Sequence, residues 1–390
     1  MPRMTAVPRS AAFLFALLFV ALNLRPSITG VGPLLRPIQD DLALSATEAG
    51  LLGSVPLLIF AGLAPLARLA GRLGTERLLL AGLVLLVVGI VVRSTDGVAA
   101  LFGGTALLAT GIAVANVLMP ILVRQHYPDR VAGVTTAYAT MMGGMAALAS
   151  GVAVPLADVL PGGWRASMAS WAALALLAVV IWAPHVRAKE CAPPMAVEEG
   201  RASIWRSPTA WLVTGYMGFQ STLFYVSVSW FPALLQDAGY TATAAGWLLT
   251  LFQIAAILAG LGVPLLMRRF ADQRALSFAA GIVSALACVG LLAVPTAAAT
   301  WMVLLGLGAG PGLIFALSFM GLRAGSPRAS AALSLMSQGL GYAVAAVGPV
   351  VFGGIHDVAG GWSAALAFAA AVGVCQALCG LGAGRAVRIP

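Results

Sequence analysis

Arg25 is the residue of this chain whose type and position have the clearest chemical consequence. It lies inside an apolar stretch, residues 10–34, that is long enough to cross a bilayer and contains no acidic residue. A cation near the bilayer centre costs about 2.5–3.5 kcal/mol even on the most lenient scale, so such a residue usually faces a bundle interior or a watery cavity. A planar guanidinium suits a small planar anion, such as a carboxylate or a cyanate-like ion. Arg25 therefore predicts an intramembrane site for something anionic or strongly polar.

The residues around Arg25 favour an interrupted helix. Pro26 lacks the backbone donor that would bond to the carbonyl of Leu22, so we expect a kink. Thr29 shares a face with Arg25 by the four-residue spacing, and Asn23 lies two residues before Arg25. Both are therefore candidate ligands of the same substrate. The alternative is structural: the guanidinium hydrogen-bonds to helix carbonyls or extends toward the outer membrane interface.

Uncharged polar side chains near the middle of other apolar stretches are the next candidates. Each is expensive to leave unsatisfied in lipid, so each either binds the substrate or joins two helices. Aromatic residues at helical spacing provide walls for a pocket or, more often, ordinary packing. Besides Arg25, Asn23 and Thr29, the candidate substrate-binding residues are Asn116, Tyr138, Tyr216, Gln220, Gln253, Phe315 and Gln338.

The composition requires a membrane around these residues. Of the 390 residues, 61% are hydrophobic and 9% are charged, and the mean hydropathy is +0.98, which is too apolar for a soluble domain. Apolar stretches of about 20 residues recur along the chain, and each matches a hydrocarbon thickness of roughly 30 Å. We predict an all-α integral membrane protein with twelve transmembrane helices, at residues 10–34, 48–68, 77–95, 98–123, 131–156, 166–184, 209–235, 243–267, 275–295, 298–321, 329–354 and 362–384.

The distribution of Lys and Arg predicts the orientation of these spans. With the N-terminus inside, 18 of the 22 basic residues fall on the inner face and 3 on the outer face, the remaining one being Arg25. Basic residues concentrate in cytoplasmic loops, so we expect both termini to be cytoplasmic and the protein to lie in a bacterial inner membrane. The net charge of +9 then follows from topology and requires no nucleic-acid partner. The expected partners are the lipid bilayer and a small-molecule substrate, and we expect a monomer to function alone.

The chain repeats itself, which predicts its division into two halves. Asp41, Thr47 and Gly50 recur as Asp237, Thr243 and Gly246 at one offset of 196. We expect two pseudo-symmetric six-helix bundles, at residues 1–184 and 208–390, joined by a cytoplasmic linker at 185–207 that has a high density of charge. Paired repeats of this kind place a substrate site near the midplane, between halves that rock against each other.

These features resemble the major facilitator superfamily over essentially the whole chain. The resemblance to the branch of cyanate permeases and 2-nitroimidazole transporters is carried by Asn23-Leu24-Arg25-Pro26, Ala64-Pro65-Leu66-Ala67 and Asn116-Val117-Leu118-Met119-Pro120. It implies secondary transport by rocker-switch alternating access. Two departures weaken a transfer of the proton-coupled mechanism: Arg68 stands where many members have an acid, and Leu107 and Leu108 stand near the place of an arginine.

Three functions follow from these observations. The first is a carrier of a small monovalent anion or small polar nitrogen compound, cyanate-like or a carboxylate. The second is a carrier or exporter of neutral nitroimidazole or drug-like compounds, with Arg25 structural. The third, an integral membrane enzyme, is disfavoured because His126, His185 and His356 fall at three separate loops, so we expect no catalytic residue, metal site or cofactor. Because all 13 acids also lie at loops or helix ends, the sequence leaves proton coupling, uniport and exchange open.

Overall fold

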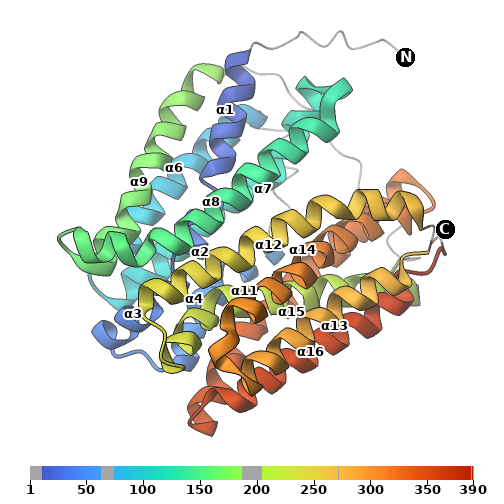
Figure 1. Ribbon diagram of the computed structural model, residues 1–390. Coiled ribbons are helices and arrows are strands. Elements are labelled where there is room, and N and C mark those ends of the chain that lie inside the picture. Colours follow the sequence, from blue (N-terminus) through green and yellow to red (C-terminus); the bar gives the residue numbers. More distant parts are fainter. Residues whose placement is uncertain (1–10, 63–73, 187–203, 271, 388, 390) are drawn as a thin grey trace.

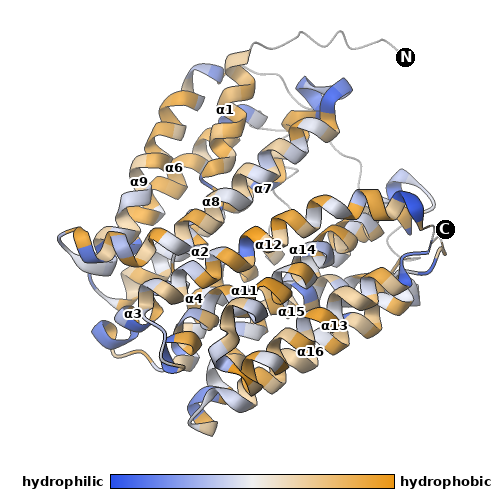
Figure 2. Ribbon diagram, viewed as in Figure 1, coloured by the Kyte–Doolittle hydropathy of each residue, from blue (hydrophilic) through white to orange (hydrophobic). Residues whose placement is uncertain are grey.

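The structure is a computed structural model that describes residues 11–62, 74–186, 204–270, 272–387 and 389. Those residues form helices and no strand of a sheet. Ten helical segments are long and apolar enough to cross a membrane, and the shorter α4 and the more polar α11 bring the spans to the expected twelve. Figure 2 shows the apolar residues along the helices and the hydrophilic residues at their ends. The departure at Arg68, the Ala64 to Ala67 motif and most of the linker lie outside the described residues.

The twelve spans form two bundles of six (Figure 1). The first span is broken into α1 (Ala11–Leu22), α2 (Pro26–Thr29), η1 (Gly32–Leu34) and α3 (Leu35–Leu42). The other spans of the N-terminal bundle are α4 (Ala46–Gly62), α6 (Thr75–Arg93), α7 (Val98–His126), α8 (Val131–Val159) and α9 (Gly163–Trp182). The C-terminal bundle contains α11 (Pro208–Asp237), α12 (Ala242–Arg269), α13 (Arg274–Ala293), α14 (Ala298–Leu322), α15 (Pro327–Ala359) and α16 (Trp362–Ala383).

The break in the first span has a local cause. Pro26 occupies the first turn of α2, where a missing N–H does no harm, and Arg25 before it has non-helical dihedrals (φ −123°, ψ −35°). Asn23 Nδ2 donates to the carbonyl of Phe19 at 3.0 Å and so satisfies an acceptor in the last turn of α1. The expected kink is confirmed as a complete interruption, with Arg25 in the non-helical segment.

The bundles meet closely on one face of the molecule. We call this the far face; it carries the turns at 43–45, 160–162, 238–241 and 360–361, whereas α1 begins and α16 ends on the opposite, terminal face (Figure 1). A Cβ on Gly32 would lie 2.0 Å from the carbonyl oxygen of Val228, and one on Gly50 would lie 2.5 Å from that of Pro349. Only glycine allows backbones of the two bundles to approach so closely. Side chains larger than hydrogen at these positions would push the far face apart.

Charged side chains join the same face. Arg36 of α3 pairs with Asp237 at the end of α11. Asp357 of α15 accepts hydrogen bonds from the backbone N–H groups of Ala46 (3.1 Å) and Thr47 (2.8 Å), and therefore caps the first turn of α4 from the other bundle. Both contacts must break before the far face can open.

The bundles separate toward the terminal face. A hollow of about 600 Å³ lies between α4 and α15 there, lined by apolar residues that include Leu58, Gly62 and Leu340. A Cβ added to Gly62 would meet no atom within 4 Å. The structure is thus a conformation closed at the far face and hollowed toward the terminal face.

Helix α11 is a comparatively polar span and lies where the bundles meet. It has 30 residues but falls outside the set of helices with a strongly apolar window. Its hydroxyls are mostly satisfied within the helix: Thr214 donates to Ala210 at 2.8 Å, Thr222 to Gly218 at 2.9 Å, and Ser227 to Leu223 at 2.7 Å. Such polarity is tolerated at membrane depth because protein, rather than lipid, surrounds it.

Candidate functional site

Arg25 reaches across the seam between the bundles. Its Nη1 donates to the phenolic oxygen of Tyr225 in α11 at 2.8 Å. Tyr225 is buried, whereas the arginine remains partly exposed. The guanidinium is therefore held between the two halves of the molecule rather than extended toward the outer membrane interface.

Aromatic rings pack near this hydrogen bond. Phe224 lies edge-on to Tyr225, with ring centroids 5.4 Å apart, and its ring is 5.8 Å from that of Phe252 in α12. Tyr342 of α15 packs against the hydrophobic cluster that contains Tyr225, within electrostatic range of Arg25, and the centroid of its ring lies 5.8 Å from that of Phe60 in α4. We call Arg25, Tyr225 and Tyr342 the seam cluster. It joins the broken first span to α11 and α15.

The seam cluster holds an uncompensated positive charge. Among the described residues, the ion pairs of the protein lie at the helix ends, and none of them includes Arg25. A phenol accepts a hydrogen bond from a guanidinium but leaves its charge in place, since arginine stays protonated in proteins. A bound anion would supply the missing negative charge. The rings would exclude water and so strengthen that attraction.

Thr29 and Gln253 lie beside the seam but are already engaged. Thr29 Oγ1 donates to the carbonyl of Ala146 at 2.9 Å, which fixes α2 against α8. Gln253 Nε2 donates to Ser150 Oγ at 2.7 Å and so links α12 to α8 across the bundles. Gln253 Oε1 is buried and accepts no hydrogen bond from the described residues. Of the polar groups of Thr29 and Gln253, this oxygen is the one that can still accept a hydrogen bond from a ligand.

Tyr216, Gln220 and Phe315 lie in the interior of the C-terminal bundle. The hydroxyl of Tyr216 donates to the carbonyl of Ser277 in α13 at 3.4 Å, and Gln220 accepts from the neighbouring hydroxyl of Ser221 at 3.3 Å. Phe315 is buried in the core cluster that also contains Tyr216. Tyr216 lies nine residues before Tyr225 on one helix, a separation of about 13 Å along its axis. The structure does not bring these three side chains to Arg25.

The remaining predicted site residues occupy intermediate positions. Gln338 lies one turn before Tyr342 on α15 and donates to Ser334 Oγ at 2.8 Å. Asn116 is half-buried in α7, and Tyr138 is half-buried in α8, where it packs against the core of the N-terminal bundle. Asn23 caps α1, as described above. Of these residues, Gln338 is the one that shares a helix with a member of the seam cluster.

The candidate residues named from the sequence do not include Tyr225 and Tyr342. A signal was present, because the repeat offset of 196 that pairs Arg25 with Ser221 also pairs Thr29 with Tyr225. Arg25 and Thr29 are one helical turn apart, and so are their counterparts. Which of the four turns toward the seam depends on the rotation of each helix, and this rotation is fixed only when the bundles pack.

Two six-helix bundles that close on one face around a polar cluster define a multi-pass membrane transporter. The chain belongs to the Major Facilitator Superfamily, whose family model matches residues 12–346. It is 42% identical over 375 residues to a 2-nitroimidazole transporter of Escherichia coli (strain K12), covering 95% of this chain and 94% of the relative. It is 27% identical over 359 residues to the cyanate transport protein CynX of the same organism, covering 90% and 91%.

Solved structures support the same fold. The D-xylose-proton symporter superimposes with a TM-score of 0.74 at 14% identity, covering 94% of this chain and 96% of the symporter. At that identity the likeness concerns the fold alone. Family and fold together identify the chain as a secondary transporter in a membrane. They do not identify its substrate.

Proposed function

We propose that the protein carries a small monovalent anion or a small polar nitrogen compound, cyanate-like or a carboxylate, and binds it at the seam cluster. The observation that supports this most directly is the hydrogen bond of Arg25 to Tyr225, made without any described acid nearby. The guanidinium would bind the anion through its free N–H groups, while the Tyr225 hydroxyl, which accepts from Arg25, donates its own proton to the ligand. A single fixed charge favours a monovalent ligand over a phosphate or dicarboxylate.

Transport would follow from the position of the cluster between the bundles. Arg25 belongs to the N-terminal bundle, and Tyr225 and Tyr342 belong to the C-terminal bundle, so a ligand held by all three links the two halves. Rocking about that ligand would expose it to one face and then to the other. The basic-residue count of 18 against 3 supports cytoplasmic termini, and bacterial relatives support an inner membrane. The terminal face is then cytoplasmic, and the protein acts as a monomer.

A second candidate substrate is a neutral nitroimidazole-like or drug-like compound. The rings of Phe60, Phe224 and the two tyrosines suit a flat and weakly polar molecule. In this case the bond of Arg25 to Tyr225 only ties the bundles together. The 2-nitroimidazole transporter named above supports this candidate by identity, and the charge of the partly buried Arg25, which no described acid balances, argues against it.

Uptake into proteoliposomes distinguishes the two. We expect the wild type to accumulate cyanate or formate, Arg25→Gln to lose this uptake, and Arg25→Lys to retain part of it. Arg268→Ala removes an exposed arginine of α12 and serves as the matched control. Anion uptake that survives in Arg25→Gln would overturn the first candidate, and uptake of 2-nitroimidazole alone, unchanged in that variant, would establish the second.

A further inference from the structure

Arg93 is a second buried cation of the N-terminal bundle. The sequence counts it among the three basic residues of the outer face, and the structure places it as the last residue of α6, with only 1% of its surface exposed. A Cβ on Gly104 of α7 would lie 2.2 Å from the backbone nitrogen of Arg93. This close approach of α7 covers the arginine.

The side chain of Arg93 bonds to a different helix. A basic residue in the last turn of a helix commonly interacts with the carbonyls of its own helix. Arg93 Nη1 instead donates to the carbonyl of Ser27 in α2, and Nε is buried without a hydrogen-bond partner among the described residues. None of the ion pairs found in the described part of the chain includes Arg93. A buried charge with so few partners carries a desolvation cost, which indicates a role beyond packing.

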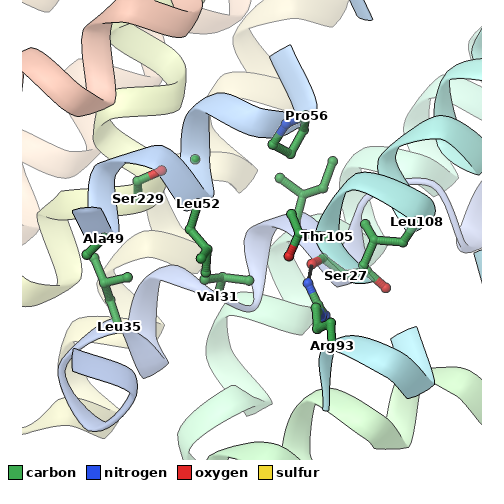
Figure 3. Close-up of a pocket in the computed structure, with 12 residues that line it drawn as sticks. Ser27, Val31, Leu35, Ala49, Leu52, Pro56, Arg93, Thr105, Leu108 and Ser229 are labelled. Carbon is green, nitrogen blue, oxygen red and sulfur yellow. Dashed lines mark hydrogen bonds between the residues drawn. The ribbon is translucent and has the colours of Figure 1, made fainter. Parts of the chain in front are cut away.

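The break in the first span leaves the Ser27 carbonyl in need of a donor. In a continuous helix the N–H of Val31 would donate to Ser27, but it donates to Ile28 at 3.3 Å instead. Arg93 supplies the missing donor from α6, as the dashed line in Figure 3 shows. A small cavity adjoins Ser27 and Ile28 on this side. The hydrogen bond from Arg93, rather than close packing, therefore holds the first turn of α2 here.

The other end of α2 is held by α8. Thr29 Oγ1 donates to the carbonyl of Ala146 at 2.9 Å, and Ser150 Oγ donates to the carbonyl of Thr29 at 3.2 Å. Because α2 has four residues, it is only about 6 Å long, and an anchor at one end leaves it free to rotate. Arg93 at its start and α8 at its end together fix this rotation.

Arg25 is attached to this short helix. It directly precedes α2, and its carbonyl accepts the N–H groups of Ile28 at 2.9 Å and of Thr29 at 3.0 Å. The direction of its side chain therefore depends on the rotation of α2. We propose that Arg93 is a positioning residue, which fixes the first turn of α2 and so directs Arg25 across the seam to Tyr225. Its effect on transport rests on the proposed function, whereas its effect on the bond between Arg25 and Tyr225 does not.

A double-mutant cycle on the purified full-length protein tests the positioning, with thermal unfolding followed by tryptophan fluorescence. Tyr225→Phe removes the acceptor of Arg25 and should lower the unfolding temperature of the wild type. In Arg93→Met, where Arg25 is no longer directed to the seam, the same change should cause less than about half that shift. If Arg93→Met fails to fold, Arg93→Gln replaces it with the same expectation. An equal shift in both backgrounds, or no shift in either, would overturn the proposal.

Arg323→Met is the matched control for this cycle. Arg323 is also buried and donates to a helix-end carbonyl, that of Ala383 at 2.8 Å, but it lies in the C-terminal bundle. Tyr225→Phe should keep its full effect on the unfolding temperature in this background. A shift reduced as much in Arg323→Met as in Arg93→Met would mean that any lost arginine weakens the response, and would overturn the specific role of Arg93.

Cyanate uptake into proteoliposomes measures the consequence for transport. Arg93→Met should raise the half-saturating cyanate concentration about tenfold or more and change the maximal rate less than about threefold, because Arg25 is displaced but still present. Arg93→Lys keeps the charge and a donor, and should restore most of the affinity. If the wild type carries no cyanate, the proposed function fails and the unfolding cycle alone decides the role of Arg93. An unchanged half-saturating concentration in Arg93→Met, in a protein whose wild type does carry cyanate, would contradict the positioning role.

Discussion

The first span and α11 hold equivalent places in the two repeats, yet they differ in backbone and in charge. The first span is interrupted at Asn23 to Arg25 and supplies a cation, whereas α11 runs unbroken for 30 residues and supplies neutral hydroxyls. At the repeat offset, Arg25 corresponds to Ser221 and Thr29 corresponds to Tyr225. Repetition therefore conserves the architecture, while single substitutions divide the ligand chemistry between the halves.

The far face shows the same division of roles. Asp158 and Asp357 end equivalent helices of the two bundles, but only Asp357 caps a helix of the opposite bundle among the described contacts. Asp158 is exposed at the end of α8. The two bundles are thus similar in fold but differ in the contacts they contribute. Substitutions at equivalent positions of the two bundles should therefore have different effects on binding and on opening.

The largest difference is expected between Arg25 and Ser221. Loss of one partner from a buried, charge-assisted contact costs about 2–5 kcal/mol, so Arg25→Gln should lower the apparent affinity for a transported anion by about 30-fold or more. Ser221→Ala should change it by less than about twofold, because among the described residues that hydroxyl bonds to its helix neighbours Gln220 and Met217. The affinities are read from the substrate dependence of uptake, and equal effects at the two positions would remove the distinction.

A smaller difference is expected between Tyr225 and Thr29. Tyr225→Phe removes the acceptor of Arg25 and a donor to the ligand, and a hydrogen bond to a charged group contributes about 1.5–3 kcal/mol, so affinity should fall about tenfold or more. Thr29→Val removes a bond between α2 and α8 and should leave affinity unchanged while lowering the unfolding temperature. The reverse pattern, with Thr29→Val affecting affinity alone, would place the ligand on the N-terminal bundle only.

The smallest difference is expected at the far face. Asp357→Asn weakens the cap on α4, and a lost cap costs about 1 kcal/mol, which corresponds to about a fivefold larger open fraction. In a Ser229→Cys background, a membrane-impermeant thiol reagent added at the far face should react about fivefold faster. Asp158→Asn should leave the rate within about twofold. Equal acceleration by both variants would contradict a one-sided latch.

The parts of the fold that sequence analysis predicted follow from local rules. Span length and hydropathy determined the helices, and the missing donor of Pro26 determined the break. The spacing of Ser45 and Glu48 is that of a capping box, and the structure forms one: Ser45 N donates to Glu48 Oε2 at 2.9 Å and Glu48 N to Ser45 Oγ at 3.2 Å. Each of these features depends on residues within a few positions of one another.

The site depended on packing that no local pattern contains. Tyr216 and Gln220 are polar and one helical turn apart, which made them candidate ligands. The rotation of α11 instead turns them toward α13 and the interior of their own bundle. Arg93 is one of the three basic residues counted on the outer face, and the approach of α7 at Gly104 buries it at the end of α6. Arg25 itself was identified because a charge inside a span is conspicuous without any knowledge of neighbours.

The central claim is that Arg25 and Tyr225 bind one anion together across the seam. Calorimetric titration of cyanate into the wild type, Arg25→Lys, Tyr225→Phe and the double variant tests it most directly, since Lys preserves the charge and keeps binding measurable. Because the two groups share a hydrogen bond and a ligand, the losses should be non-additive by about 1 kcal/mol or more. Strictly additive losses, or cyanate binding unchanged in Tyr225→Phe, would contradict the shared site.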